Sequence, residues 1–368
     1  MNAITAPVSA SAWRLAAPGG TLSLEQVAVP EPRPGTVRVR MQAVPLLSYL
    51  RTYAEGKLPY WYPAGPFTPG TNGIGTVEAV GSDVYHLTPG QRVAVSPYLV
   101  ANEIADDPAQ VLIGLTGISP DSGPMLAAWG DGTLAERVIV PASVLAPLDG
   151  LDHLPAERLA AFGKFVVPLG GLLRGRLSPG ETLLVNGASG YFGSAAVLLG
   201  LAMGAERVVA AARTRESLED LAQAGGMRVV PVALTGDVEA DAKALKAASG
   251  GRGVHFAFDQ VGRAGDPNST LAALKSLRRG GRLVLMGSMT VPLPLTYAEI
   301  LANDWEVIGN FMYRPGAFQT LAALVRSGQL DLSLVRISTF GLRELPEAME
   351  QAAEMRGLDC TVIRMEAG

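Results

Sequence analysis

Apolar and polar positions alternate in short runs over the first 150 residues. Residues 37–41 and 75–80 alternate with a period of two, which is the period of a strand with one buried face. Prolines are dense between these runs, at positions 30, 32, 34, 59, 63, 66 and 69. The pattern predicts a compact barrel of short strands joined by turns. Residues 97–130 fit it least, and we expect a long loop or arm there with a helix over 101–109.

The pattern changes after about residue 151, where short apolar runs alternate with helical periodicity. We predict strands at 182–185, 208–211, 229–230, 254–258, 283–286 and 306–308, and helices at 194–203, 217–224, 238–248 and 268–277. Strict alternation of strand and helix indicates a parallel sheet covered on both faces. The tail is mixed again, with expected helices at 317–327 and 345–354 and strands at 335–340 and 361–364.

The composition supports a large folded core. The chain has 368 residues, of which 48% are hydrophobic and 17% charged, so general disorder is excluded and about two domains are expected. The formal net charge of −4 argues against a nucleic-acid binder with a basic surface. Cys360 is the only cysteine, so neither an internal disulfide nor a multi-thiolate zinc site can form.

Two stretches bear on the location of the protein in the cell. Residues 1–18 lack a basic start followed by a long apolar run, so we expect no secretory signal and a cytoplasmic protein. Residues 183–205 carry no charge and are long enough to cross a bilayer. They also hold Asn186, two serines and five glycines, which favour a strand, a glycine turn and a buried helix over a membrane span.

The most informative segment lies where the first strand of the α/β series meets its helix. An apolar strand runs into Gly187, Gly190 and Gly193, which are spaced by three, and then into an apolar helix. The N-terminus of a helix presents N–H groups and the positive end of its dipole, and glycines let a pyrophosphate approach the backbone. We therefore predict dinucleotide binding here, with an ordinary glycine turn as the alternative. The predicted contacts are Gly187, Ala188, Ser189, Gly190, Tyr191, Phe192 and Gly193.

The end of the second strand should distinguish the two nicotinamide dinucleotides. NAD sites place Asp or Glu about 20 residues past the glycines, where it accepts hydrogen bonds from the ribose. Here no acid ends the strand, and Arg213 and Arg215 follow it. Because a guanidinium can pair with a 2′-phosphate through two hydrogen bonds, we predict NADP(H) over NAD(H). The alternative is that both arginines are solvated loop charges.

Further ligand contacts are expected where later strands end, because a doubly wound sheet binds its ligand at the carboxyl ends of its strands. Val261 follows the fourth strand, and Gly287 and Ser288 follow the fifth. We assign all three to the cofactor site. Asp259 either belongs to the site or caps a turn.

Three segments, residues 66–81, 131–141 and 177–182, are similar to segments of one known family. Through them the chain resembles, over nearly its whole length, the medium-chain dehydrogenase/reductase superfamily, in its zinc-independent quinone-oxidoreductase-like branch. The resemblance implies an α/β protein in which a Rossmann doubly wound parallel sheet, over residues 151–311, is inserted in a GroES-like β-barrel catalytic domain made of residues 1–150 and 312–368. It also implies a homodimer or homotetramer, of which we expect the homodimer.

The resemblance further shows what this chain lacks. Zinc-dependent members carry His-Glu where this chain has Thr71 and Asn72, and their catalytic cysteine position falls near Val44 and Pro45. The three histidines are scattered through unrelated segments, whereas a zinc site needs three or four convergent ligands. We therefore expect no metal, and a substrate that is already electrophilic.

Candidate catalytic residues come from the same resemblance. The stretch from Tyr49 to Arg51 is similar to a Tyr-x-x-Arg stretch of quinone-oxidoreductase-like relatives, and Tyr62 stands near where enoyl reductases use a tyrosine. A phenol can act as a general acid or donate a hydrogen bond to an oxyanion. We assign all three residues to catalysis, with aromatics that only line an apolar pocket as the alternative. After the sixth strand, Asn310 is expected at the nicotinamide carboxamide and Phe311 at the pocket, with packing between domains as the alternative.

The sequence therefore predicts an NADPH-dependent, zinc-independent oxidoreductase that transfers hydride to a quinone or an activated alkene, such as an enone, enal or enoyl ester. One alternative is a zinc-free dehydrogenase or reductase of a pathway-specific alcohol or carbonyl compound. Another is a non-catalytic NADPH-binding protein. The expected partner is a small-molecule substrate, with neither nucleic acid nor membrane.

Overall fold

The structure, a computed structural model, describes residues 8–102 and 104–366. Within these residues the chain forms two compact units. The β unit comprises residues up to 163 together with 335–355 and 360–366, and the α/β unit comprises residues 164–334 and 356–359.

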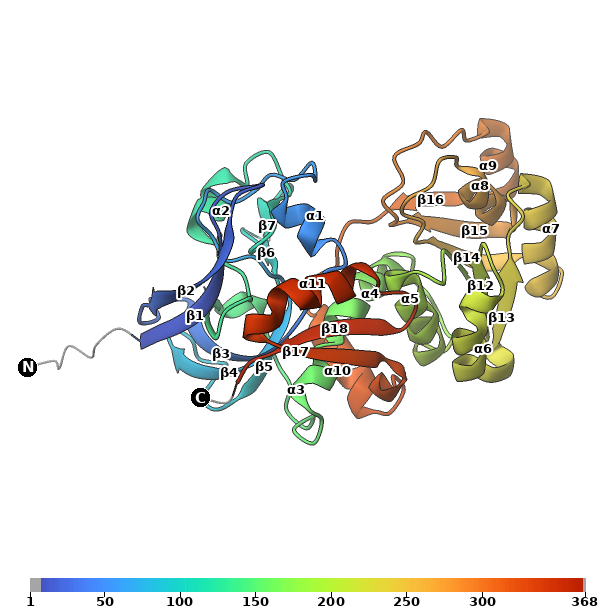
Figure 1. Cartoon of the computed structure of the whole chain (residues 1–368). Helices are drawn as coiled ribbons and strands as arrows, with labels where there is room; N and C mark the ends of the chain where they lie inside the picture. Colours follow the sequence, from blue (N-terminus) through green and yellow to red (C-terminus); the bar gives the residue numbers. More distant parts are fainter. Residues whose placement is uncertain (1–7, 103, 367–368) are drawn as a thin grey trace, which may run out of the picture. The chain divides into compact units, whose positions relative to one another are not determined.

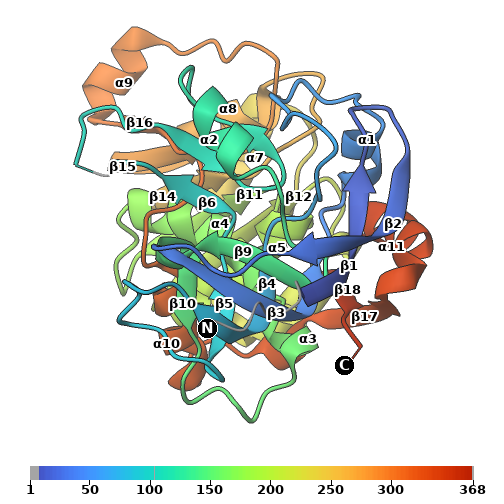
Figure 2. The ribbon, with the colours of Figure 1, turned by 90° about the vertical axis from the view of Figure 1, so that its left-hand side faces the viewer.

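The β unit is built on a seven-stranded sheet of order β10-β5-β4-β3-β18-β17, in which β9 also pairs with β3. Figure 2 shows β3, β4, β5, β9 and β10 of this sheet side by side. The strands are β3 (Thr36–Pro45), β4 (Gly73–Val80), β5 (Arg92–Val95), β9 (Arg137–Pro141), β10 (Leu145–Pro147), β17 (Arg336–Gly341) and β18 (Asp359–Arg364). Because β18 pairs antiparallel with β3, the two ends of the chain contribute to one sheet.

Smaller elements complete the β unit. A hairpin of β1 and β2 is joined to the rest by isolated bridges, and β6, β7 and β8 form a three-stranded sheet. Their bounds, with those of the unit's short helices, are β1 (Val8–Leu15), β2 (Leu22–Val29), β6 (Tyr98–Val100), β7 (Gln110–Leu112), β8 (Thr116–Gly117), α1 (Leu50–Ala54), α2 (Gly123–Ala128), α3 (Ala156–Leu159) and α11 (Leu345–Ala353).

The prediction of a helix over residues 101–109 is wrong. The described residues of this stretch form turns and bends, and the helix of the arm is α2 instead. Asn102 has a φ of 56°, a left-handed conformation that a helix does not accept. Ile104, the large apolar side chain described in this segment, is 96% exposed and therefore does not pack on the protein. Short helices depend on such packing, and helical residue types alone did not make one here.

The α/β unit is a six-stranded sheet of order β13-β12-β11-β14-β15-β16. Its strands are β11 (Thr182–Asn186), β12 (Arg207–Ala212), β13 (Val229–Ala233), β14 (Val254–Asp259), β15 (Leu277–Leu285) and β16 (Glu306–Gly309). Every neighbouring pair is parallel. This is the doubly wound order, in which the strand order reverses beside the first strand. The predicted fold class is confirmed.

One strand begins earlier than its sequence indicates. β15 starts at Leu277 rather than at 283, and the register of β15 against β14 shifts between Val254 and Phe256. The irregularity takes up residues 278–281, which read Arg-Arg-Gly-Gly. Charged residues and glycines concealed the start of this strand because they break the apolar pattern.

Helices cover both faces of the α/β sheet (Figure 1). They are α4 (Phe162–Arg174), α5 (Tyr191–Ala202), α6 (Glu219–Gly225), α7 (Val238–Ala248), α8 (Asn268–Lys275), α9 (Tyr297–Asn303) and α10 (Ala317–Arg326). Leu184, Val209 and Ala257 share one buried cluster with residues of α7 and α8. Val208 points the other way, because its Cγ2 lies 3.4 Å from the position that a Cβ on Gly200 of α5 would take. Successive strand residues therefore face opposite layers, as the period of two requires.

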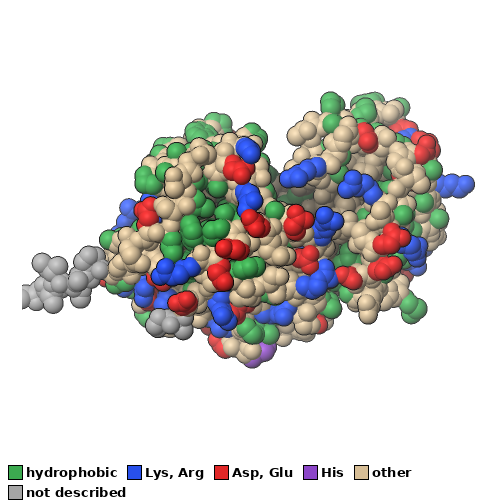
Figure 3. All heavy atoms as spheres, in the orientation of Figure 1, with side chains coloured by type: hydrophobic (Ala, Val, Ile, Leu, Met, Phe, Trp, Pro, Cys, Tyr) green, Lys and Arg blue, Asp and Glu red, His purple; other side chains and the backbone are tan. Residues whose placement is uncertain are grey.

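The predictions on membranes and nucleic acids rest on helices and on charge. No helix in the described part of the chain is both long and apolar enough to cross a membrane. Residues 183–205 form most of β11, the glycine turn and α5. On the face shown in Figure 3, basic side chains are interspersed with acidic ones rather than gathered in one field.

Candidate dinucleotide-binding site

The turn between β11 and α5 is tightly packed, and two of its positions, Gly187 and Gly193, favour glycine. Gly187 has a φ of 83°, in the left-handed region that favours glycine. A Cβ on Gly193 would overlap the carbonyl oxygen of Gly187. The first turn of α5 is therefore seated directly on the end of β11. This is the close approach of helix to strand that a dinucleotide-binding turn needs.

The N-terminus of α5 suits an anion. Gly190 is its N-cap residue, no side chain caps it, and no acidic residue lies in its first turn. The backbone dipoles therefore leave a partial positive charge there that no carboxylate offsets within the helix. The predicted contacts of residues 187–193 remain a prediction, and this geometry supports them.

Arg213 and Arg215 follow β12, the strand next to β11 in the sheet. Both are exposed, and neither guanidinium group makes a hydrogen bond or ion pair with another described residue. Because β11 and β12 are parallel, the arginines follow the same sheet edge as the glycine turn. Their guanidinium groups are available to a ligand phosphate, and their assignment stays a prediction.

Asp259 at the end of β14 holds neighbouring strands together. Its carboxylate accepts hydrogen bonds from Asn186 Nδ2 at 3.1 Å, Thr270 Oγ1 at 2.6 Å and the backbone N–H of Val261 at 2.9 Å. Burial raises the pKa of this carboxyl, and the three donors oppose that rise. Of the two alternatives for Asp259, the hydrogen bonds favour the structural one, because they tie β14 to the end of β11. The sequence did not reveal this network, which joins residues up to 73 positions apart.

The turns after β14 and β15 touch at the same edge of the sheet. A Cβ on Gly287 would overlap the carbonyl oxygen of Val261, and one on Gly262 would lie 3.2 Å from Ser288 Oγ. Beside them, Gln260 Nε2 is buried without a hydrogen-bond partner among the described residues. The structure thus brings Val261, Gly287 and Ser288 together near the glycine turn, as their assignment requires.

Asn310 and Phe311 follow β16, and the side-chain amide nitrogen of Asn310 is already hydrogen-bonded within this loop. Asn310 Nδ2 donates to the carbonyl oxygen of Met312 at 2.9 Å and lies 3.3 Å from the sulfur of Met286. The amide oxygen of Asn310 is therefore the group left for a ligand such as a carboxamide. Phe311 is 61% exposed. Both assignments remain predictions.

The candidate catalytic tyrosines belong to an aromatic cluster in the β unit. The ring of Tyr53 stacks on that of Tyr62 at 4.6 Å between centroids, and Tyr60 lies 6.2 Å from Tyr49 and 6.5 Å from Tyr62. Tyr62 donates a hydrogen bond to the carbonyl oxygen of Tyr53 at 3.0 Å. Burial raises the pKa of Tyr49 well above its ordinary value and raises that of Tyr62 as well. Both phenols therefore stay protonated at neutral pH.

Arg51 makes a different contact from the one its assignment suggests. It forms an exposed ion pair with Glu350 of α11, 3.0 Å between Nη2 and Oε1. Its guanidinium is thus engaged on the protein surface. Its catalytic assignment stays a prediction that the ion pair does not favour.

Thr71 and Asn72 stand at the positions where the resemblance places the His-Glu pair of zinc-dependent relatives. Thr71 and Asn72 are both buried. Asn72 Nδ2 donates to Thr71 Oγ1 at 3.3 Å, and Asn72 Oδ1 has no hydrogen-bond partner among the residues that the structure describes. A Cβ on Gly163 would lie 2.9 Å from Pro45 Cγ and 3.2 Å from the Cβ of Asn72. Zinc takes thiolate, imidazole and carboxylate ligands. This corner offers a hydroxyl and an amide, so its residues do not fit zinc. Across the described residues, no three or more His, Cys, Asp or Glu side chains gather as a metal site.

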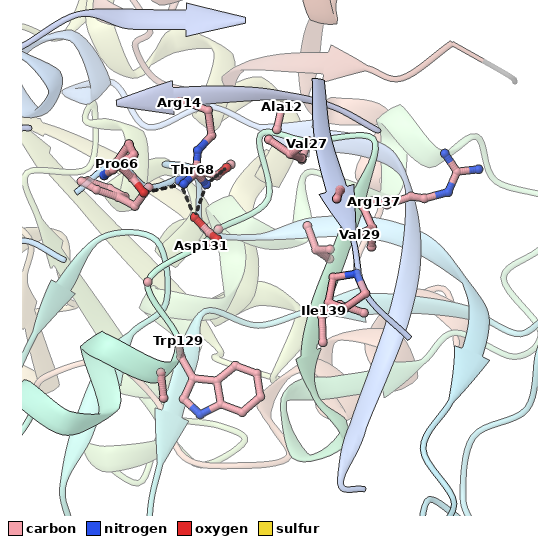
Figure 4. Close-up of a pocket in the computed structure, with 18 of the residues that line it drawn as sticks. Ala12, Arg14, Val27, Val29, Pro66, Thr68, Trp129, Asp131, Arg137 and Ile139 are labelled. Atoms are coloured by element: carbon pink, nitrogen blue, oxygen red, sulfur yellow. Dashed lines mark hydrogen bonds and ion pairs between the residues drawn. The ribbon is translucent and has the colours of Figure 1, made fainter. Parts of the chain in front are cut away.

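A cavity of about 710 Å³ lies elsewhere in the β unit, among β1, β2, β9 and the loops near Pro66 and Trp129 (Figure 4). Asp131 closes one end of it, accepting from Arg14 at 2.5 Å and from the N–H of Thr68 at 2.7 Å. None of the predicted site residues lines it. We therefore do not assign it to the reaction.

Two family descriptions match the chain in succession. "Alcohol dehydrogenase GroES-like domain" matches residues 33–150, and "Zinc-binding dehydrogenase" matches residues 192–327. The chain is 28% identical to a putative D-xylulose reductase of Agrobacterium fabrum, over 92% of this chain and 95% of that protein. It is 26% identical to the sorbitol dehydrogenase of Bacillus subtilis, over 91% of each. The narrower expectation of a quinone-oxidoreductase-like branch is not confirmed by these relatives.

Solved structures show the same fold. A putative zinc-binding dehydrogenase from Sinorhizobium meliloti bound to NADP superimposes with a TM-score of 0.75 at 22% identity, covering 97% of this chain and 99% of that one. The β unit, the doubly wound sheet and its glycine turn agree with the two family matches. The chain belongs to the medium-chain dehydrogenase/reductase superfamily of NAD(P)-dependent oxidoreductases.

Proposed function

We propose that this protein is an NADP(H)-dependent dehydrogenase or reductase that interconverts a small alcohol, of the polyol type, and its carbonyl compound. This was the first alternative to quinone or alkene reduction, and the relatives favour it because they are named for sorbitol and D-xylulose. The observation that carries the oxidoreductase assignment is the glycine turn, in which Gly193 is seated on Gly187 beneath an uncapped helix N-terminus.

The residues of the α/β unit fit a dinucleotide. Residues 187–193 would hold the pyrophosphate at the start of α5, and the turns after β14 and β15 would border the ribose next to the nicotinamide. Arg213 and Arg215 would pair with a 2′-phosphate, which supports NADP(H) over NAD(H). When bound, the nicotinamide supplies a hydride donor or acceptor.

The proton of the reaction would be held by the aromatic cluster of the β unit. Because burial raises the pKa of Tyr49 and Tyr62, each phenol carries its proton at neutral pH and can donate it to an alkoxide. Tyr62 already donates to Tyr53, so it would have to exchange that hydrogen bond for the substrate. The hydroxyl of Tyr49 is the better candidate, because its hydrogen-bond partner is the side chain of Tyr60 rather than a backbone carbonyl.

The substrate oxygen would be bound by neutral groups rather than by a metal. In the corner where zinc does not fit, the available donors are the hydroxyl of Thr71 and the second N–H of Asn72 Nδ2, whereas Asn72 Oδ1 can only accept. Hydrogen-bond donors aimed at a developing oxyanion are worth several kcal/mol at about 2.7–3.1 Å. Such donors also suffice for quinones and enones, whose charge is delocalised, and this keeps that substrate class as the second candidate.

The test is a substrate panel with both cofactors. We expect NADP⁺ reduction with polyols such as sorbitol and xylitol, or NADPH oxidation with the matching ketoses, faster than with NAD(H). Turnover confined to quinones and enones would overturn the alcohol assignment in favour of the second candidate. Binding of NADPH without turnover on any of these classes would indicate a non-catalytic binding protein. Sizing by light scattering in the same study tests the predicted homodimer.

A further inference from the structure

Lys164 is a lysine with 0% exposure, three residues into α4. Its Nζ donates hydrogen bonds to two backbone carbonyl oxygens, those of Tyr191 at 2.5 Å and Gly357 at 2.6 Å. The same Nζ lies 3.8 Å from the centre of the Tyr191 ring, in a cation–π contact. Burying an ammonium group is costly unless it is hydrogen-bonded in this way. The sequence places this lysine in an otherwise apolar run and gives no hint of its partners.

Both partners of Lys164 belong to the neighbourhood of the glycine turn. Tyr191 is the first residue of α5, so its carbonyl lies in the first turn of the helix that follows Gly190. Gly357 belongs to residues 356–359, the short segment of the chain end that is part of the α/β unit. The N–H of Gly357 donates to the carbonyl oxygen of Ser189 at 3.0 Å. Ser194 Oγ also donates to the carbonyl oxygen of Gly357, at 2.5 Å.

These contacts form a closed set around the predicted phosphate-binding backbone. Gly357 binds the carbonyl oxygen of Ser189 through its N–H. Its own carbonyl oxygen accepts hydrogen bonds from Lys164 and Ser194. Lys164 also holds residue 191 directly. The carbonyl groups of Ser189 and Tyr191 are thus held by one ammonium group and one distant segment of the chain, in addition to the backbone hydrogen bonds of the turn itself.

We propose that Lys164 is a positioning residue for the dinucleotide pyrophosphate: it fastens residues 356–359 to the first turn of α5 and so sets the backbone that binds the diphosphate. This rests on the proposed function, because it assumes that the turn binds a dinucleotide. Lys164 acts through the carbonyls of Tyr191 and Gly357 and does not itself need to touch the ligand. Its loss should therefore weaken ligands that carry a diphosphate more than ligands that do not.

The experiment compares calorimetric binding of ADP and adenosine to the full-length protein and to Lys164→Met, which keeps a similar volume without the ammonium. We expect ADP to bind about tenfold more weakly to the variant, with adenosine changed about twofold or less, because lost hydrogen bonds from a charged group act on the diphosphate site. Leu169→Ala, at a fully buried position in the same helix, is the control. It lowers the melting temperature without changing the ratio of the two dissociation constants.

Ser194→Ala keeps the proposal testable if Lys164→Met does not fold. It removes only the second donor to Gly357, and we expect a smaller loss in the same direction, again confined to ADP. An unchanged ratio of the ADP and adenosine constants in a folded variant would overturn the positioning role, as would equal losses for the two ligands. If the unaltered protein binds neither ADP nor NADPH, it is the proposed function that fails.

Discussion

The carbonyl oxygen of Gly187 occupies the space that a side chain on Gly193 would need. This contact seats α5 on β11 and leaves no room for a methyl group between them. We predict that Gly193→Ala shifts the start of α5, destabilises the protein by about 1–3 kcal/mol and weakens NADPH binding at least about tenfold. Gly180→Ala is the control for a glycine with open space around it, although its positive φ adds strain. It should lower the melting temperature while leaving the NADPH dissociation constant unchanged, and equal effects of both variants on binding would contradict the account.

The arginines after β12 should decide which cofactor is preferred. We predict that the double variant Arg213→Ala, Arg215→Ala raises the dissociation constant of NADPH at least about tenfold, since even one lost hydrogen bond to a charged group is worth about 1.5–3 kcal/mol. The constant for NADH should stay the same. Arg252→Ala is the matched control, because this exposed arginine precedes β14 and so lies toward the opposite edge of the sheet. Parallel losses for NADPH and NADH would show that the pair does not read the 2′-phosphate.

His255 gives the α/β unit a pH-dependent stability. Burial lowers its pKa from the ordinary value, and Arg278 lowers it further; its Nδ1 accepts a hydrogen bond from the N–H of Thr182 at 3.1 Å. The folded state therefore binds fewer protons than the unfolded state below about pH 6.5, and the unfolding free energy falls as the pH drops through that range. Chemical denaturation at pH values from about 5 to about 8, the range in which histidine side chains titrate, should show this slope.

His255→Gln should flatten that slope, whereas His153→Gln, at an exposed position, should leave it in place. A slope that persists in His255→Gln would assign the pH dependence to other groups.

The tyrosine cluster should supply the proton. We predict that Tyr49→Phe lowers kcat by about 10²-fold or more with little change in KM for the cofactor, because a positioned general acid contributes about that much. Tyr62→Phe should have the smaller effect, since its hydroxyl is committed to the carbonyl of Tyr53. Steady-state rates with NADPH and the substrate from the panel measure both. If neither variant lowers kcat, water delivers the proton and the cluster only lines a pocket.

Activity should survive metal chelation. Asn72 and Thr71 offer zinc no suitable ligand, and Gly163 brings no side chain to that corner. We predict that overnight treatment with EDTA or phenanthroline leaves kcat unchanged and that elemental analysis finds zinc well below one per chain. Loss of activity together with the removal of one equivalent of zinc would contradict this.

The fold could be predicted largely from periodicity, because its elements are set by local patterns. Alternating apolar strands and helices indicated the parallel sheet, and the last strand was expected where β18 pairs with β3. The prediction of a helix over 101–109 failed because helix propensity is weak evidence where a side chain such as Ile104 has nothing to pack on.

The site was predictable only where one short segment carries it. Gly187 to Gly193 could be recognised because spacing along the chain encodes the turn. Lys164 could not be recognised, since its partner Gly357 lies 193 positions away and only the folded chain brings them together. The same holds for Asp259 and Asn186, which the order of the sheet places side by side.

The most direct test of the account is a calorimetric titration of the purified protein with NADPH and, separately, with NADH. The account predicts saturable one-to-one binding of NADPH, at least about tenfold tighter than NADH, because the guanidinium groups of Arg213 and Arg215 meet the extra phosphate. Absence of binding by either dinucleotide would contradict it.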